Sequence, residues 1–419
     1  MSNTAVLVMA LRQLRMLITE NMKVKIILSV LLGGILPILS AAQPNSVSEQ
    51  ATQNLLYVDS SGSMKGYLGA SSDDRFIGTL AAFMYSAPTE VRLFGTQEGK
   101  ALSSSQFEKQ LNAKSIQWSA ESDLTKMISS LIQRISGGYA SYGILITDGI
   151  MSGSNSEIQR EPNYNKTRRG LLTQKILNVF NTYKDNKENK QLSAIVIQYT
   201  SSFGGKYYDY KNTNITLNNK ERPYYAIIFV KSEDCNSYLQ NLEQNDALKA
   251  YTNIYVIGES QPDIKILPYK ETASIVSGGL QMNSAAIKKN DGNLALTVAI
   301  QKLPNYMRDA EFIQNNIELI KINDKDEQQV ISPERYTLEV ASNRLVLSIN
   351  PNYIKGSKIK VKIKNSLPRW IEIASSDDDS QIAYDEIELA RTFNFKYLMD
   401  GFKPLHTYAD IATPEISIR

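Results

Sequence analysis

The sequence predicts an α/β fold in which a doubly wound, mostly parallel sheet is followed by a β-sandwich module and a C-terminal helix. Three observations support this prediction. Between residues 51 and 260, short apolar runs alternate with segments of helical spacing; from 264 to 375, apolar runs continue without long helices between them; and helical spacing returns within 376–419. Strands that alternate with helices indicate right-handed crossovers and a mostly parallel sheet covered on both faces.

Apolar runs bounded by polar or turn residues predict the buried strands of the first part. The runs lie at 55–58, 91–94, 143–147, 194–197, 225–230 and 254–257. Helices are predicted between them, because apolar side chains recur at i, i+4 and i+7, as in Phe76, Leu80 and Phe83. The segment 203–225 is rich in Tyr, Asn, Lys and Gly. It fits either a recognition loop with exposed aromatic side chains or a hairpin that packs its tyrosines on the sheet edge.

Residues 264–375 predict a β-sandwich module. Its strand candidates lie at 294–300, 317–322, 336–340, 345–349 and 358–364. In the last of these, three β-branched apolar residues alternate with four lysines, which is the period of a strand with one solvated face. In the tail 376–419, apolar residues between 387 and 398 indicate a final amphipathic helix that ends near Gly401.

Residues 1–42 predict an N-terminal extension and a secretory signal peptide. The signal starts at Met22 and consists of two lysines, an uncharged apolar run at 26–39 and small residues before a cleavage point after Ala42. We therefore expect an exported chain, periplasmic or extracellular. An uncleaved membrane anchor is the alternative, which the short apolar run and its internal Pro37 disfavour.

Charge and composition exclude several classes of function. Of the 46 Lys and Arg and the 43 Asp and Glu residues, signal cleavage would remove four basic residues and one acidic residue, which leaves 42 of each. A chain without net charge has no general attraction for nucleic acid. Because Cys235 and His406 are the only residues of their kinds, an internal disulfide, a cysteine-based zinc cage and a histidine-rich metal site are excluded. The acidic run 377–379 fits a solvated turn better than a calcium site.

Oxygen-bearing side chains follow two of the predicted strands. The first strand ends in Asp-Ser-Ser-Gly-Ser at 59–63, and a later one ends in Thr-Asp-Gly at 147–149. Ligands of an open α/β sheet bind outside the carboxyl ends of its strands. We therefore expect these oxygen atoms to collect at one edge of the sheet.

This arrangement resembles the metal-ion-dependent adhesion site of the von Willebrand factor A family. The first loop of that site reads Asp-x-Ser-x-Ser, and its third loop supplies an Asp after an apolar strand. The matching residues are Asp59, Ser61, Ser63 and Asp148. The resemblance covers residues 51–260 and implies the doubly wound, Rossmann-like fold of that family.

The second loop of the family usually supplies a Thr in a Gly-Thr-Asp/Asn-Leu context. Here Glu-Ser-Asp-Leu at 121–124 fits that register and assigns Ser122, while Thr125, one turn further on, remains an alternative. Hydroxyl and carboxylate oxygens suit a hard cation. We expect Mg²⁺, with Ca²⁺ or Mn²⁺ as alternatives.

In the family, the open position on the metal accepts a carboxylate from a protein partner. The resemblance therefore implies an exported protein-binding protein, for adhesion or assembly, that is not an enzyme and takes no nucleic-acid partner. Membrane contact would occur only through an uncleaved signal segment. The alternatives are a cell-envelope scaffold with a purely structural metal loop and, less favoured, a metal-dependent hydrolase, for which only Asp123 or Asp148 could act as the general base.

Overall fold

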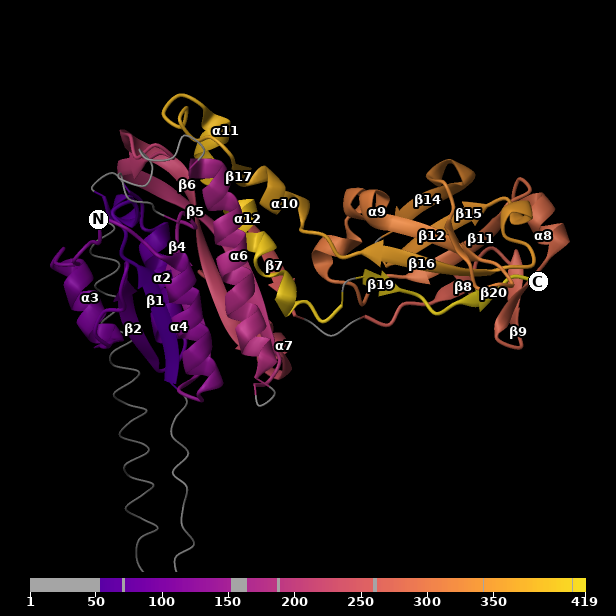
Figure 1. The fold of residues 1–419 in the computed structure, drawn as a ribbon, viewed down its shortest axis with the longest axis horizontal. Coiled ribbons are helices and arrows are strands. Elements are labelled where there is room, and N and C mark those ends of the chain that lie inside the picture. The colour runs from indigo at the N-terminus through magenta and orange to yellow at the C-terminus, as the bar shows by residue number, and fades with distance from the viewer. Residues whose placement is uncertain are drawn as a thin grey trace, which may run out of the picture. The chain divides into compact units, whose positions relative to one another are not determined.

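The computed structural model describes residues 53–69, 72–151, 164–186, 189–258, 262–341, 343–408 and 410–419 (Figure 1). The predicted signal peptide lies outside these residues, so cleavage and export stay predictions. Among the described residues, no helix is both long enough and apolar enough to cross a membrane.

Seven strands form the principal sheet, in the order β3-β2-β1-β4-β6-β5-β7. They are β1 (Gln53–Asp59), β2 (Thr89–Phe94), β3 (Leu102–Ser103), β4 (Ala140–Thr147), β5 (Leu192–Tyr208), β6 (Asn214–Lys231) and β7 (Asn253–Ile257). Strand β1 pairs in parallel with β2 and β4, and all other neighbouring pairs in this sheet are antiparallel. The sheet is therefore mixed, and the prediction of a mostly parallel sheet is wrong.

The long hairpin of β5 and β6 accounts for two of the four antiparallel pairs, those of β6 with β5 and with β4. Its pairing runs from Leu192 opposite Lys231 to Tyr208 opposite Asn214. The turn at its tip contains Asn212 in the left-handed region, at φ 58°. Strands joined by a short turn run antiparallel, whereas parallel neighbours need a long crossover. The segment 203–225 is thus part of a hairpin, as one of the two alternatives predicted, but β5 and β6 lie inside the sheet and not at its edge.

The strands direct alternate side chains to two hydrophobic cores, one on each face of the sheet. Leu55 and Tyr57 belong to the first core, and Leu56 and Val58 to the second. The first core is covered by α4 (Leu124–Ser136), α6 (Tyr164–Asp185), α10 (Arg369–Ile373) and α12 (Phe395–Asp400) (Figure 1). The second is covered by η1 (Met64–Leu68), α2 (Arg75–Tyr85), α3 (Ser104–Asn112) and α7 (Cys235–Glu243), which directly follows the short helix η2 (Ser232–Asp234). Helices cover both faces, as predicted.

The C-terminal segment returns to the principal sheet in short pieces. They are β17 (Ser375–Ser376), α11 (Glu386–Leu389), β18 (Thr392–Phe393), α12 and η6 (Lys403–Leu405). The prediction of one amphipathic helix is wrong, because Asn394 at φ 62° interrupts the helical path between α11 and α12. Phe395 and Phe402 enter the first core, where the Phe402 ring lies 5.0 Å from that of Phe180.

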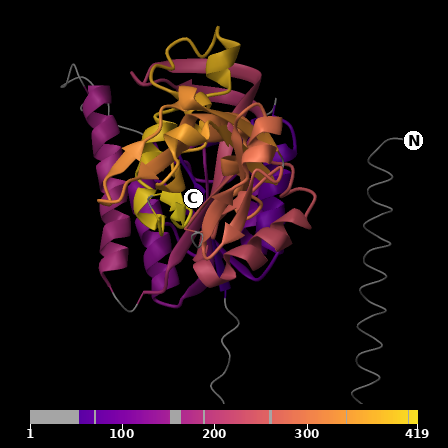
Figure 2. The same cartoon turned by 90° about the vertical axis from the view of Figure 1, so that its right-hand side faces the viewer.

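The β-module has its own core between two antiparallel sheets, β14-β15-β11-β8 and β13-β12-β16-β19, with β20 also paired to β16. In Figure 2 this module faces the viewer. Its strands are β8 (Ile266–Pro268), β11 (Leu294–Ala299), β12 (Ile317–Ile322), β13 (Gln328–Val330), β14 (Tyr336–Ala341), β15 (Arg344–Ile349), β16 (Lys358–Lys364), β19 (Asp410–Ala412) and β20 (Ile416–Ser417). Its remaining elements are the hairpin β9 (Ala273–Val276) and β10 (Gly279–Met282), the helices α8 (Ser284–Lys289) and α9 (Ala310–Asn316), and the short helices η3 (Asn305–Arg308), η4 (Pro333–Arg335) and η5 (Pro351–Tyr353).

The module is discontinuous in sequence, because β19 and β20 come from the last ten residues and pair with β16. The boundaries drawn at 264–375 and 376–419 therefore do not follow the sheets. The alternation predicted for β16 is present: its three apolar side chains are fully buried. Of its four lysines, Lys358, Lys362 and Lys364 form ion pairs with acidic residues of neighbouring segments.

Candidate metal centre

The candidate site lies at the carboxyl ends of the adjacent parallel strands β1 and β4. Asp59 is the last residue of β1 and is fully buried. Its Oδ1 accepts a hydrogen bond from the Ser61 amide at 2.8 Å, and its Oδ2 accepts one from Thr147 Oγ1 at 2.8 Å. Asp59 therefore joins the loop that follows β1 to the end of β4.

The serine loop reaches Asp148 directly. Ser63 Oγ donates to Asp148 Oδ2 at 2.5 Å, and the Ser61 and Ser63 hydroxyl oxygens lie 3.2 Å apart. The other Asp148 oxygen, Oδ1, accepts from the Ile150 amide at 3.0 Å. The structure thus brings together four of the five predicted ligands: Asp59, Ser61, Ser63 and Asp148.

Burial of two carboxyl groups dominates the electrostatics of this site. Burial raises the pKa of Asp59, and the nearby charge of Asp148 raises it further. Burial also raises the pKa of Asp148, against the hydrogen bond from Ser63 and the positive charge of Arg222. Two buried carboxylates favour a cation that offsets their charge.

The donor set fits a hard divalent cation. It consists of hydroxyl and carboxylate oxygens, the ligands that Mg²⁺ and Ca²⁺ prefer. Among the described residues, no group of three or more His, Cys, Asp and Glu side chains could hold a metal. A metal here would therefore depend on the hydroxyl groups of Ser61 and Ser63 as well as on the carboxylates.

The second loop is less directly connected. Ser122 is buried, and its Oγ donates to the Ile150 carbonyl at 3.0 Å, two residues beyond Asp148. The Thr125 hydroxyl is buried in α4 and has no hydrogen-bond partner in the described part of the chain. Ser122 is thus attached to the third loop, while the choice between Ser122 and Thr125 as a ligand stays a prediction.

Close packing of glycines fixes the serine loop on the β5–β6 hairpin. Helix η1 begins directly after Ser63 and lies on β5. A Cβ atom on Gly66 would overlap the Phe203 ring, at 2.6 Å from Cε1 and closer to two other ring atoms. A Cβ atom on Gly205 would lie 2.9 Å from the Gly66 Cα atom. Backbone approaches backbone here, which only glycine permits.

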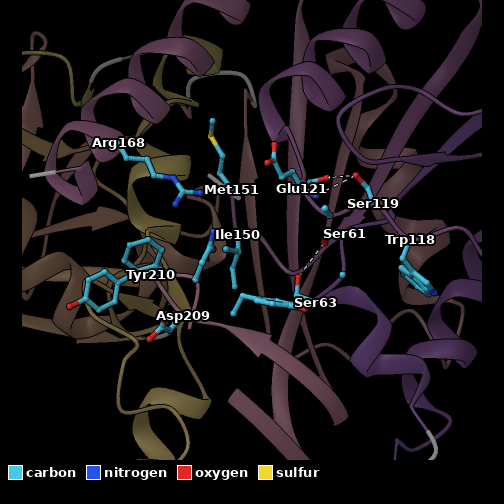
Figure 3. A pocket seen from close by; sticks show the side chains of 15 residues that line it. Ser61, Ser63, Trp118, Ser119, Glu121, Ile150, Met151, Arg168, Asp209 and Tyr210 are labelled. Carbon is cyan, nitrogen blue, oxygen red and sulfur yellow. Dashed lines mark hydrogen bonds between the residues drawn. The ribbon is translucent and has the colours of Figure 1, made fainter. Parts of the chain in front are cut away.

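A pocket of 460 Å³ opens beside the serine loop. In the view of Figure 3, Ser61 and Ser63 lie between Trp118 and the hairpin-tip residues Asp209 and Tyr210. The lining comes from six parts of the chain: Ser61, Gly62 and Ser63; Trp118, Ser119, Ala120 and Glu121; Ile150 and Met151; Arg168; Tyr208, Asp209, Tyr210 and Asn212; and Phe393. The pocket therefore extends the candidate metal centre into a surface that could hold a ligand.

The C-terminal segment anchors the hairpin tip that lines this pocket. Asp379 is only 2% exposed and accepts from Tyr207 Oη at 2.5 Å and from the Tyr210 amide at 2.8 Å. The fully buried Arg222 lies over the Tyr207 ring at 4.7 Å. The prediction of a solvated turn at 377–379 is wrong for Asp379, because this carboxyl holds the hairpin instead of facing solvent.

Sequence reasoning missed Thr147, whose hydroxyl bonds to Asp59 and accepts from the Gly149 amide at 3.0 Å. Its position directly before Asp148 was the available signal. Cys235 is buried. His406 lies away from the site, where its ring nitrogens contact Tyr255 and Asn365.

A scan against models of known protein families gave no match for this chain, and a search among curated proteins also gave none.

Proposed function

We propose that this chain is an exported protein-binding protein whose von Willebrand factor A-like domain uses a divalent cation to capture a carboxylate of a partner. The observation that carries the proposal is the contact of Ser63 with Asp148, which joins the loops after β1 and β4 beside an open pocket. The resemblance in sequence assigns a metal to those same two loops. Export rests on the signal-like segment at 22–42.

Part of the principal sheet supports the assignment to this fold. The parallel strands β2, β1 and β4, with helices on both faces and the candidate site at their carboxyl edge, agree with a doubly wound domain. The antiparallel strands β5, β6 and β7 extend this arrangement on the other side of β4. In our proposal, the hairpin of β5 and β6 is an addition to this domain, and the hairpin forms one wall of the binding site.

Each site residue has a distinct task. Ser61, Ser63 and Asp148 would hold Mg²⁺, with Ser122 or Thr125 as a further ligand, and the bound cation would supply positive charge for a partner's carboxylate. Asp59 orients the loop, since its two oxygens hold the Ser61 amide and the Thr147 hydroxyl. These groups hold a ligand in place and perform no bond-breaking step, so the proposed activity is binding.

Thermal unfolding with and without Mg²⁺ tests the metal. A ligand at 100 times its Kd stabilises the folded state by about 2.7 kcal/mol, which corresponds to a rise in Tm of roughly 5–10 °C. Asp59→Ala should abolish this rise, and Ser63→Ala, which leaves Asp59 in place, should reduce it strongly. Asp324→Ala, an exposed site in the β-module, is the matched control and should keep the full rise.

A capped Gly-Gly-Asp-Gly-Gly peptide tests carboxylate capture. It should bind the wild-type chain in Mg²⁺ and not in EDTA, and replacing its Asp by Asn should abolish binding. Wild-type protein without a Mg²⁺-dependent rise in Tm, or an unchanged rise in Asp59→Ala, would contradict the metal site. Equal binding of the Asp and Asn peptides would contradict the capture of a carboxylate.

A further inference from the structure

The tip of the β5–β6 hairpin, residues 208–212, adjoins the serine loop. Tyr208 Cε2 lies 3.7 Å from the position that a Cβ atom on Gly62 would occupy. Its side chain nevertheless remains 40% exposed. Tyr210 stacks on Phe393, with ring centroids 6.0 Å apart and an interplanar angle of 29°. These three aromatic rings line the pocket that begins at the candidate metal ligands, and Trp118 lines it as well.

The Asp209 carboxyl group of the tip is engaged within the turn itself. Asp209 is 6% exposed, and its Oδ1 accepts from the Lys211 amide at 2.9 Å and the Thr213 amide at 2.6 Å. The wall that the tip presents to the pocket therefore combines the two rings of Tyr208 and Tyr210 with a carboxyl group that already has its hydrogen-bond partners. Ile150 and Met151, from the loop after β4, add further apolar surface to the same pocket.

The wall is held in position before any ligand binds. Asp379 fixes the tip through Tyr207 and the Tyr210 amide, and the glycine contacts fix the end of β5, just before the tip, against η1. A preformed aromatic surface loses little conformational freedom when it contacts a ligand. Aromatic side chains in such positions commonly dominate the binding energy of an interface.

The pocket also has room for more than one group. Its 460 Å³ lies within the range of about 300–1,000 Å³ that is typical of ligand pockets. A single carboxylate at the serine loop would leave the aromatic part of that space unfilled. The ligand that complements both parts carries an anionic group and a large apolar group next to each other.

We infer that the site selects a peptide segment in which an acidic residue stands beside an aromatic residue, and that Tyr208 and Tyr210 are the specificity-determining residues for that neighbour. This inference rests on the proposed function, because the acidic residue would be held at the metal. The aromatic neighbour would pack against Tyr208, Tyr210 and Phe393. The partner is accordingly an extended, acidic and aromatic stretch of another protein.

Binding of two capped peptides in Mg²⁺, measured by isothermal titration calorimetry, tests the inference. Gly-Phe-Asp-Phe-Gly places an aromatic residue on both sides of the Asp, and Gly-Gly-Asp-Gly-Gly places none. The aromatic peptide should bind the wild-type chain about tenfold or more tightly, since burial of one such side chain contributes at least that much. Tyr208→Ser should bring the ratio of the two affinities close to one, and Tyr208→Phe, which keeps the ring, should retain the preference.

The matched control is Tyr384→Ser, because Tyr384 is 88% exposed and does not line the pocket. This variant should preserve the preference, and all three variants should keep the Mg²⁺-dependent rise in Tm. Equal affinity of the wild-type chain for both peptides, or an unchanged preference in Tyr208→Ser, would overturn the inference while leaving the metal site intact. No rise in Tm with Mg²⁺ in the wild-type chain would instead overturn the proposed function.

Discussion

The contact of Gly66 with Phe203 allows a sharp test of how the serine loop is held. In Gly66→Ala, the new Cβ atom would lie 2.6 Å from Phe203 Cε1, whereas ordinary van der Waals contact begins at 3.4 Å. The Phe203 ring has little room to move, because it is 1% exposed and packs edge-on against Tyr67 at 5.1 Å. Overpacking of a tight core costs about 1–3 kcal/mol. We expect about 3 kcal/mol here, since backbone would have to shift.

This loss corresponds to a fall in Tm of about 6–12 °C, measurable by differential scanning calorimetry. Because η1 starts directly after Ser63, the shift should also weaken the Mg²⁺-dependent rise in Tm. Gly78→Ala is the matched control: Gly78 lies in α2, and a Cβ atom there would meet nothing within 4 Å. Alanine should stabilise that helix by about 0.5–1 kcal/mol. A Tm of Gly66→Ala equal to that of wild type would refute the packing argument.

Two further predictions concern the C-terminal segment. In Arg222→Met, the carbonyl oxygens of Leu389 and Arg391 each lose a 2.9 Å hydrogen bond from the guanidinium. The free energy of unfolding, measured by urea denaturation, should therefore fall by about 3 kcal/mol. An unchanged denaturation midpoint would count against this role of Arg222. Burial, with a smaller effect of the Lys403 charge, lowers the pKa of His406 to about 4. Because the pKa of an unfolded histidine is about 6.5, the unfolded chain binds more protons than the folded chain between these two pH values. Stability should therefore fall by about 2 kcal/mol from pH 7 to pH 5 relative to His406→Gln, and parallel pH profiles of the two proteins would contradict the assignment.

Much of the fold around the candidate site follows from local sequence patterns. The apolar runs that end at Asp59 and at Asp148 form β1 and β4, and the helical spacing after Ser122 forms α4. Each of these signals lies within about ten residues of chain. Because such a strand is buried on both faces, its continuous run of apolar residues identifies it in the sequence.

The order of the strands could not be read in the same way. Whether β5 pairs with β4 or with β6 depends on contacts between segments far apart in the sequence. The spacing of apolar residues along one strand does not specify these contacts. The Tyr-rich stretch illustrates the limit, because Tyr207 is buried and Tyr208 is exposed although they are neighbours. Alternation of faces along a strand explains their difference once β5 is known to extend that far.

Partners that are distant in the sequence also determine whether a charged side chain is buried or exposed. Arg222 would be expected at the surface, yet it is buried, because carbonyl oxygens from residues 388–391 accept its hydrogen bonds. Asp379 lies 172 residues from Tyr207 in sequence and anchors it directly. No local pattern indicates either pairing, so the support of the hairpin tip emerges only from the structure.

The most direct test of the central claim is an anomalous difference map from crystals grown in Mn²⁺, which can replace Mg²⁺ at an oxygen site. We predict one strong peak within bonding distance of the Ser61 and Ser63 hydroxyl oxygens and beside Asp148, and its absence from crystals of Asp59→Ala. A map without a peak at this position, in crystals that show the serine loop in order, would contradict the metal centre on which the proposed function rests.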